Sequence, residues 1–195
     1  MKIVGTDDAD VERALVVGEF DCPDCGCRLR PWGSARWRVV RWRGGGEERR
    51  RPRRARCAGC GATHVLIRAD SLCRRRDLAA VIGAALVAKA AGAGHRRAAV
   101  AVGVPVSTVR GWLRRFAANA EAVRVWFTVM AHDLDPLLAP ILPSASVIAD
   151  AVEAIAVAAR AASLRLAPVE PWSFASVASR GRLLSNTGWP WAAAG

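Results

Sequence analysis

The sequence lacks tyrosine and has only two lysines, Lys2 and Lys89, so arginine carries nearly all of its positive charge. It also lacks long apolar runs, because no segment reaches the roughly 18 to 20 uncharged apolar residues that a membrane-spanning helix requires. Its first residues are acidic (Asp7, Asp8 and Asp10 among them), whereas a secretory signal starts with basic residues and continues with a longer apolar stretch. We therefore expect a cytoplasmic protein with no membrane partner.

Sequence signals of catalysis are missing as well. There is no phosphate-binding loop, no Ser/His/Asp arrangement and no redox dithiol beside a βαβ pattern. A two-metal nuclease needs converging carboxylates, but those of the C-terminal part are scattered over expected helices: Glu121, Asp133, Asp135, Asp150, Glu153 and Glu170. We expect a protein that is not an enzyme and has no small-molecule substrate. The alternative is a transposase relic or subunit that needs a separate catalytic chain.

The positive charge is concentrated in one part of the chain. The formal net charge is +12 and the isoelectric point is about 11.1. Counting charged side chains gives about −3 for residues 1–20, +11 for 21–76, +5 for 77–118 and −1 for 119–195. A biased composition, the simpler explanation for so much arginine, would spread the charge evenly. The observed concentration is typical of a surface that binds a polyanion.

Two cysteine turns form the clearest motif. Cys22-Pro23-Asp24-Cys25-Gly26 and Cys57-Ala58-Gly59-Cys60-Gly61 supply two thiolates each, and four thiolates make a closed tetrahedral zinc site. The glycine after each second cysteine permits a positive φ, which turns backbone N–H groups toward the sulfurs. We expect a zinc ribbon over residues 21–70, with one structural Zn²⁺ held by Cys22, Cys25, Cys57 and Cys60.

Other arrangements of the same residues stay open. The cysteines are free or disulfide-bonded in the simplest alternative. Cys27 is an alternative ligand, and His64 is a further one, although a packed or exposed histidine fits that position better. Cys73 is expected to be an ordinary thiol. The absence of a secretion signal fits cysteines that stay reduced.

Between the cysteine turns, residues 29–56 are expected to form two strands around Gly44-Gly45-Gly46. Arginines occupy both alternating positions of the second strand, so neither of its faces is expected to enter a core, and metal binding must hold the hairpin. Trp32, Trp37 and Trp42 are expected to cover the metal turns or to stack with arginines. The candidate DNA-contacting side chains here are Arg36, Arg38, Arg41, Arg43, Arg51 and Arg53. The alternative is a solvated surface.

Residues 77–118 are expected to form three helices. Asp77 is the expected N-cap of the first, Gly103 the sharp turn before the third, and Pro105 its first turn. A small residue before a glycine turn and a basic helix after it predict a trihelical helix-turn-helix. The expected inner face of the last helix is Val104, Val109, Trp112, Leu113 and Phe116. The expected DNA contacts are Arg96, Arg97, Ser107, Thr108, Arg110, Gly111, Arg114 and Arg115. The alternative is an ordinary three-helix bundle with a solvated basic face.

Together these motifs resemble a known family. The similarity is carried by the first cysteine turn, Arg30 to Gly33, Arg53 to Gly61, Thr63 to Leu66, Ser107 to Phe116 and Gly181 to Asn186. They resemble an uncharacterised actinobacterial family that combines a zinc ribbon with a homeodomain-like helix-turn-helix, a pairing similar to the N-terminal DNA-binding part of insertion-element transposases. The resemblance implies zinc and DNA binding but no particular reaction. Val106 departs from the usual pattern, because a polar or basic residue is common at its position.

The rest of the chain is expected to be helical. Residues 1–20 should contain one helix, and residues 119–179 should form C-terminal helices, with Ser144 capping the longest of them. A loose tail should follow over 180–195. The apolar stripes of the C-terminal helices are core or, alternatively, a homodimer surface.

The expected fold class is thus mainly α with a small β zinc ribbon, followed by the trihelical helix-turn-helix and a C-terminal helical region. The expected function is a zinc-stabilised protein that binds duplex DNA, regulatory or associated with a mobile element. The alternatives are an accessory, transposase-derived protein and a module that binds RNA or another protein.

Overall fold

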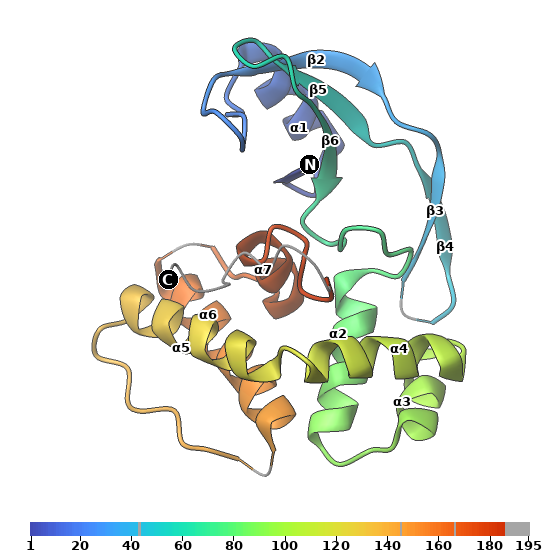
Figure 1. The fold of residues 1–195 in the computed structure, drawn as a ribbon, viewed down its shortest axis with the longest axis vertical. Coiled ribbons are helices and arrows are strands. Elements are labelled where there is room, and N and C mark those ends of the chain that lie inside the picture. The colour runs from blue at the N-terminus through green and yellow to red at the C-terminus, as the bar shows by residue number, and fades with distance from the viewer. Residues whose placement is uncertain (43, 145, 166, 186–195) are drawn as a thin grey trace.

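The computed structural model describes residues 1–42, 44–144, 146–165 and 167–185. Figure 1 shows the strands gathered with α1 at one end and the other helices at the opposite end. The described strands are β1 (Lys2–Val4), β2 (Leu29–Ser34), β3 (Arg38–Arg41), β4 (Glu47–Arg50), β5 (Arg53–Cys57) and β6 (Thr63–Arg68). The described helices are α1 (Asp8–Val17), α2 (Ala79–Ala90), α3 (His95–Val102), α4 (Val106–Ala117), α5 (Ala120–Leu134), α6 (Val147–Arg165) and α7 (Pro171–Ala178). The fold therefore combines helices with a small mixed sheet. Two expectations, a DNA contact from Arg43 and a loose tail over 186–195, lie outside the described residues.

The sheet half is built on a four-stranded sheet in the order β1-β6-β5-β2. β1 is parallel to β6, and the other neighbouring pairs are antiparallel. The expected N-terminal helix is α1: the Asp7 side chain accepts from the N–H of Asp10 at its start, and Gly18 ends it in the left-handed conformation. Its buried face, Val11 and Leu15, packs with the sheet in a small core that also contains Cys22 and Cys57. The cysteine turns thus belong to this core.

The arginine-rich segment is not one continuous hairpin. β2 pairs with β5, with a register shift between Pro31 and Ser34, whereas β3 and β4 form a separate two-stranded ribbon. The expectation that neither face of the second strand enters a core is wrong for β5, because Ala55 is fully buried. Arginine permits this burial, since its long stem can lie along apolar surface while its charged end reaches water or a carboxylate.

The helical half contains three helices, α2, α3 and α4, that contact one another pairwise. α3 ends at Gly103 with φ of +66°, as the sequence predicted, and α4 follows after Pro105. The predicted inner face of α4 is confirmed, because all five of its members are buried: Val104, Val109, Trp112, Leu113 and Phe116. The N-cap prediction for Asp77 is wrong. α2 starts one residue later, after Leu78, and the buried Asp77 carboxylate forms an ion pair with Arg41 instead.

The C-terminal helices extend the same core. α5 and α6 pack along each other, and their apolar stripes, including Phe127 and Ile155, are buried there. The hydroxyl of Ser146 accepts from the N–H of Ala149 at the start of α6, whereas Ser144 bonds to Asp150. Ser146 therefore takes the capping place that the sequence assigned to Ser144. No helix among the described residues is long and apolar enough to cross a membrane.

The first residues of the expected tail are packed rather than loose. Leu183 and Leu184 are buried in the helical core, and the carbonyl of Gly181 accepts from the N–H of Cys73 at 2.8 Å. The burial of Leu183 and Leu184, together with this backbone hydrogen bond, explains why residues 180–185 pack against the core.

The two halves meet where α7 contacts β1 and along the β3–β4 ribbon, which runs from the sheet to the start of α2 (Figure 1). The N–H of Arg41 donates to the carbonyl of Arg76, and the N–H of Leu78 donates to the carbonyl of Arg41. The Arg41–Asp77 ion pair, 2.9 Å between Nη2 and Oδ1, reinforces the same junction. The ribbon is therefore attached directly to the residues that begin the three-helix unit.

Candidate functional site

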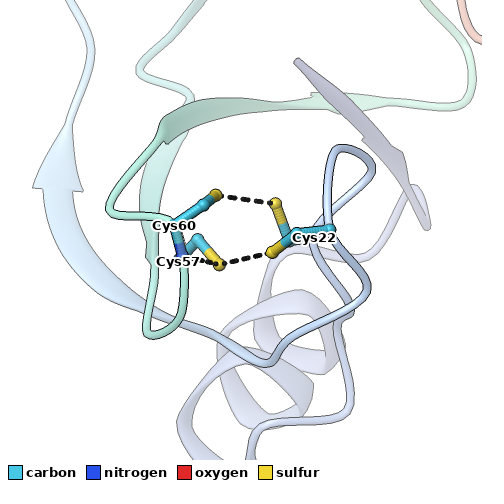
Figure 2. Close-up of side chains that lie close together, drawn as sticks. Cys22, Cys57 and Cys60 are labelled. Carbon is cyan, nitrogen blue, oxygen red and sulfur yellow. Dashed lines mark hydrogen bonds between the residues drawn. The ribbon is translucent and has the colours of Figure 1, made fainter.

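The two cysteine turns bring four sulfur atoms together. Figure 2 shows Cys22 facing Cys57, the last residue of β5, and Cys60, on the turn between β5 and β6. The Sγ–Sγ distances are 3.8 Å for Cys22 and Cys60 and 3.4 Å for Cys25 and Cys57. All four sulfurs lie within 4.8 Å of one another. A tetrahedron of sulfurs 2.3 Å from a zinc ion has edges of about 3.8 Å, so this four-cysteine cluster fits one metal ion of that size.

Local backbone geometry explains how these turns point their sulfurs inward. Gly26 and Gly61 have φ of +74° and +72°, as predicted for the glycine after each second cysteine. In the second turn, the N–H groups of Gly59 and Cys60 donate to Sγ of Cys57 at 3.3 and 3.4 Å. Such bonds stabilise a thiolate. All six cysteines are free, so the disulfide alternative does not describe this structure.

Hydrogen bonds within the cluster shift the pKa values of its thiols in opposite directions. The pKa of Cys25 is lowered to about 6 by a backbone hydrogen bond from Cys27 and by thiol hydrogen bonds from Cys57 and Cys60. A backbone hydrogen bond from Ala62 lowers the pKa of Cys60, but its bonds to Cys25 and Cys57 outweigh this and raise it to about 12. One thiolate thus forms first and its neighbours donate to it. A bound metal ion would replace these shared protons.

His64 and Cys27 lie beside the cluster. His64 is buried on β6, with Nε2 3.4 Å from Sγ of Cys22 and 3.7 Å from the Asp24 carboxylate. Desolvation lowers the pKa of His64, so its ring is neutral at pH 7 and suits a hydrogen bond to the sulfur. Cys27 is exposed, faces Gly59 and falls outside the group of four mutually close sulfurs. The four predicted cysteines are thus the ones brought together.

The second candidate site is the outer face of α4. Ser107, Arg110 and Arg114 are exposed there, and Val106 is 41% exposed beside them. Thr108, Gly111 and Arg115 are half-buried, and the guanidinium of Arg115 donates to the carbonyl of Gly111, so it folds back on its own helix. Arg96 and Arg97 are exposed on α3. No carboxylate of the described residues forms an ion pair with Arg96, Arg97, Arg110 or Arg114.

The candidate DNA-contacting arginines between the two cysteine turns lie in different environments. Arg36 and Arg51 are exposed. Arg53 donates to both carboxylate oxygens of Glu12 at 2.7 and 2.9 Å, and Arg41 pairs with Asp77. These two guanidinium groups are therefore already neutralised within the chain. Arg38 is half-buried on β3.

The predicted stacking of tryptophan with arginine is confirmed for two residues. The guanidinium of Arg56 lies 4.7 Å from the centre of the Trp32 ring, and that of Arg49 lies 5.4 Å from the centre of the Trp37 ring. Both rings remain at least half exposed. Trp42 lies against Gly46 at the ribbon's turn. Exposed rings flanked by cations are a surface on which further planar or anionic groups can bind.

The carboxylates that pair with Arg53 on β5 and Arg41 on β3 were missed at the level of sequence. Glu12 lies in α1 and Asp77 lies before α2, so each meets its arginine only through the tertiary fold. No local pattern connects such residues. Comparisons of the chain with protein-family models, with curated proteins and with solved structures find no match.

Proposed function

We propose that this chain binds duplex DNA, with α2, α3 and α4 acting as a helix-turn-helix and the four-cysteine cluster holding one structural Zn²⁺ in a zinc ribbon. The observation that carries the proposal is the two-sided character of α4. One side, with Val109, Trp112 and Phe116, is buried against α2 and α3, while the other presents Arg110 and Arg114 to solvent.

The spacing of these arginines supports groove binding. Arg110 and Arg114 are four residues apart, so they are neighbours on one helix face and repel each other in the free protein. A polyanion relieves this repulsion. Arginine also pairs in a bidentate manner with the major-groove edge of guanine, and Ser107 near the start of α4 is placed for a phosphate.

The cysteine cluster supports a structural metal. Four thiolates fill a tetrahedral shell and leave no position for substrate or water. Cys22 and Cys57 are at the same time part of the small core of the sheet half. The ion would therefore hold the sheet, and through the β3–β4 ribbon it would support the orientation of exposed basic residues such as Arg36 and Arg51.

A selection of bound sequences from a random duplex pool tests the proposal. We expect a short motif to be enriched, and the double variant Arg110→Ala, Arg114→Ala to bind the selected duplex at least tenfold more weakly. Arg160→Ala on α6 is the matched control, because Arg160 is exposed on a helix outside the three-helix unit; its affinity should stay within about twofold. Failure to enrich any motif would contradict sequence recognition by α4.

The exposed tryptophans favour RNA as a second candidate partner. Trp32 and Trp37 are 50% and 55% exposed and lie beside arginines, which suits stacking with unpaired bases. Competition between the selected duplex and a structured RNA separates the two possibilities. Displacement of duplex by RNA at equal or lower concentration would favour this second candidate.

A further inference from the structure

A cavity of about 170 Å³ lies where α1, the four-stranded sheet and the β3–β4 ribbon meet. Part of its wall is apolar and comes from Val4, Val11 and Leu66, on β1, α1 and β6. The ribbon side is lined by arginines, among them Arg38 and Arg50. The lining of the cavity includes none of the four clustered cysteines and no residue of α4, so neither candidate site accounts for it.

Most of the arginines that line the cavity have carboxylate partners. Arg50 lies 2.9 Å from Asp70 and 2.9 Å from Glu48. Arg68 lies 3.3 Å from Asp70 and 3.6 Å from Asp8. Arg53 holds Glu12, as described above. Arg51 is exposed and lies 6.0 Å from the Trp37 ring centre. Each of these guanidinium groups is thus paired with a carboxylate or, for Arg51, exposed to solvent near an aromatic ring.

Arg38 is the exception. It lies on β3 directly opposite Arg50 on β4, so two like charges share one face of the ribbon. Its side chain is half-buried, and its Nε is shielded from solvent without a hydrogen-bond partner. Within the described part of the chain, Arg38 has no ion pair or ring contact. Desolvation is the main cause that lowers the pKa of Arg38; Arg50 lowers it as well, whereas Cys73 and Asp70 act in the opposite direction.

An unpaired guanidinium at such a place is unfavourable in the free protein. Taking a charge partly out of water costs free energy that only a counter-charge or good hydrogen bonds return. The nearby Asp70 carboxylate attracts Arg38 electrostatically, but it is bound to Arg50 and lies 3.3 Å from Arg68. Three guanidinium groups thus share this carboxylate, and Arg38 forms no direct ion pair with it.

We infer that this cavity binds a small organic anion, with a carboxylate or phosphate group on Arg38 and a short apolar body against Val4, Val11 and Leu66. The planar guanidinium can bind either acidic group through two parallel hydrogen bonds. The apolar wall selects against inorganic ions, which gain nothing from it. This site is independent of the proposed DNA binding.

Calorimetric titration of the full, metal-loaded chain with benzoate and with phenyl phosphate tests the inference, with uncharged benzyl alcohol as the comparison compound at constant ionic strength. We expect saturable binding of at least one of the two anions, and the stronger of them identifies the acidic group. Benzyl alcohol should bind at least tenfold more weakly. Saturable binding of neither anion, or equal binding of the alcohol, would overturn the proposal.

Two variants localise the binding. Arg38→Gln should weaken the anion at least tenfold, whereas Arg49→Gln should change it less than twofold, because Arg49 is exposed on the opposite face of the same ribbon. In the absence of any anion, Arg38→Met should raise the Tm, since it keeps the stem and removes the unpaired charge. A lower Tm for Arg38→Met would show that Arg38 has a partner within the chain and would refute the inference.

Discussion

At the scale of single residues, the four-cysteine cluster depends on side chains that few substitutions can replace. A thiolate binds a soft cation far better than a hydroxyl, which stays protonated at pH 7. Cys57 is the most connected member, because its sulfur accepts two backbone N–H bonds and lies 3.4 Å from Cys25. It is also buried in the small core of the sheet half.

We predict that Cys57→Ser lowers the bound zinc from one ion per chain to well below half an ion, measured by elemental analysis of the purified protein. Cys73→Ser is the matched control. Cys73 lies outside the cluster, burial raises the pKa of its thiol, and that thiol donates to the carbonyl of Arg180, which a serine hydroxyl can also do. Full zinc content in Cys57→Ser would contradict the proposed ligand set.

The role of Cys27 is decided by the same measurement on another pair of variants. Cys25→Ser should lose zinc and Cys27→Ser should retain it, because only the Cys25 sulfur lies within 4.8 Å of the other three. The reverse result would assign the fourth ligand position to Cys27.

At the scale of elements, the sequence predicted some parts well and others not. The α3–α4 pair follows from local signals: Gly103 at the turn, Pro105 before α4, and buried positions at helical spacing. The arginine-rich segment does not follow from such signals. The sequence shows no apolar–polar alternation there, because arginine occupies exposed and half-buried positions alike. The burial of Ala55 depends on β6 and α1, which pack over β5.

The same limit explains which site residues were found. The four clustered cysteines lie in two short motifs, so the sequence was sufficient to find them. The division of the arginines into free and paired ones depends on Glu12 and Asp77, which only the fold brings to Arg53 and Arg41. Long-range ion pairs leave no periodic trace in a sequence.

Helix packing gives a prediction at this scale. Gly83 lies inside α2, and a Cβ there would run into the ring of Trp172 at the start of α7. Glycine to alanine in a helix interior normally stabilises by about 1 kcal/mol, but here the ring must move and the sign should reverse. We predict that Gly83→Ala lowers the free energy of unfolding by about 1–3 kcal/mol, measured by urea denaturation.

Gly111→Ala is the matched control for this prediction. It lies inside α4, where a Cβ meets only the flexible end of the Arg115 side chain, at 3.0 Å. We expect no loss of stability, and a gain of up to about 1 kcal/mol. Stabilisation by both variants would contradict the close packing of α7 on α2.

At the scale of the whole molecule, the charge that remains free determines how a polyanion binds. Arg41 and Arg53 are neutralised internally, whereas six candidate arginines stay exposed: Arg36, Arg51, Arg96, Arg97, Arg110 and Arg114. Each phosphate neutralised contributes about −0.9 to the slope of log K against log salt. The number of free arginines thus sets the salt dependence.

For about six phosphates, we predict a slope near −5 for duplex binding, measured by fluorescence anisotropy between low and moderate salt. The double variant Arg110→Ala, Arg114→Ala should reduce its magnitude by up to about 2, and Arg160→Ala should leave it unchanged. A slope near zero for the wild-type chain would contradict binding through its cationic surface.

The separation of the two cores determines which part of the molecule a metal ion in the four-cysteine cluster would stabilise. The core of the sheet half includes Cys22 and Cys57, whereas the core of the helical half contains none of the four clustered cysteines. Metal binding by small zinc modules contributes about 10–16 kcal/mol to their folding. Loss of the ion should therefore unfold the sheet half and leave the helical half largely intact.

We predict that a strong chelator exposes residues 21–70 to limited proteolysis while α2 to α6 stay protected, because Ile82, Phe116, Phe127 and Ile155 remain buried together without the metal. The helical circular dichroism signal should persist, and added zinc should restore the protection of 21–70. Simultaneous loss of both halves would mean that the contacts between them, among them the Arg41–Asp77 ion pair and the packing of α7 on β1, couple them into one cooperative unit. That outcome would extend the role of the metal to the orientation of α4.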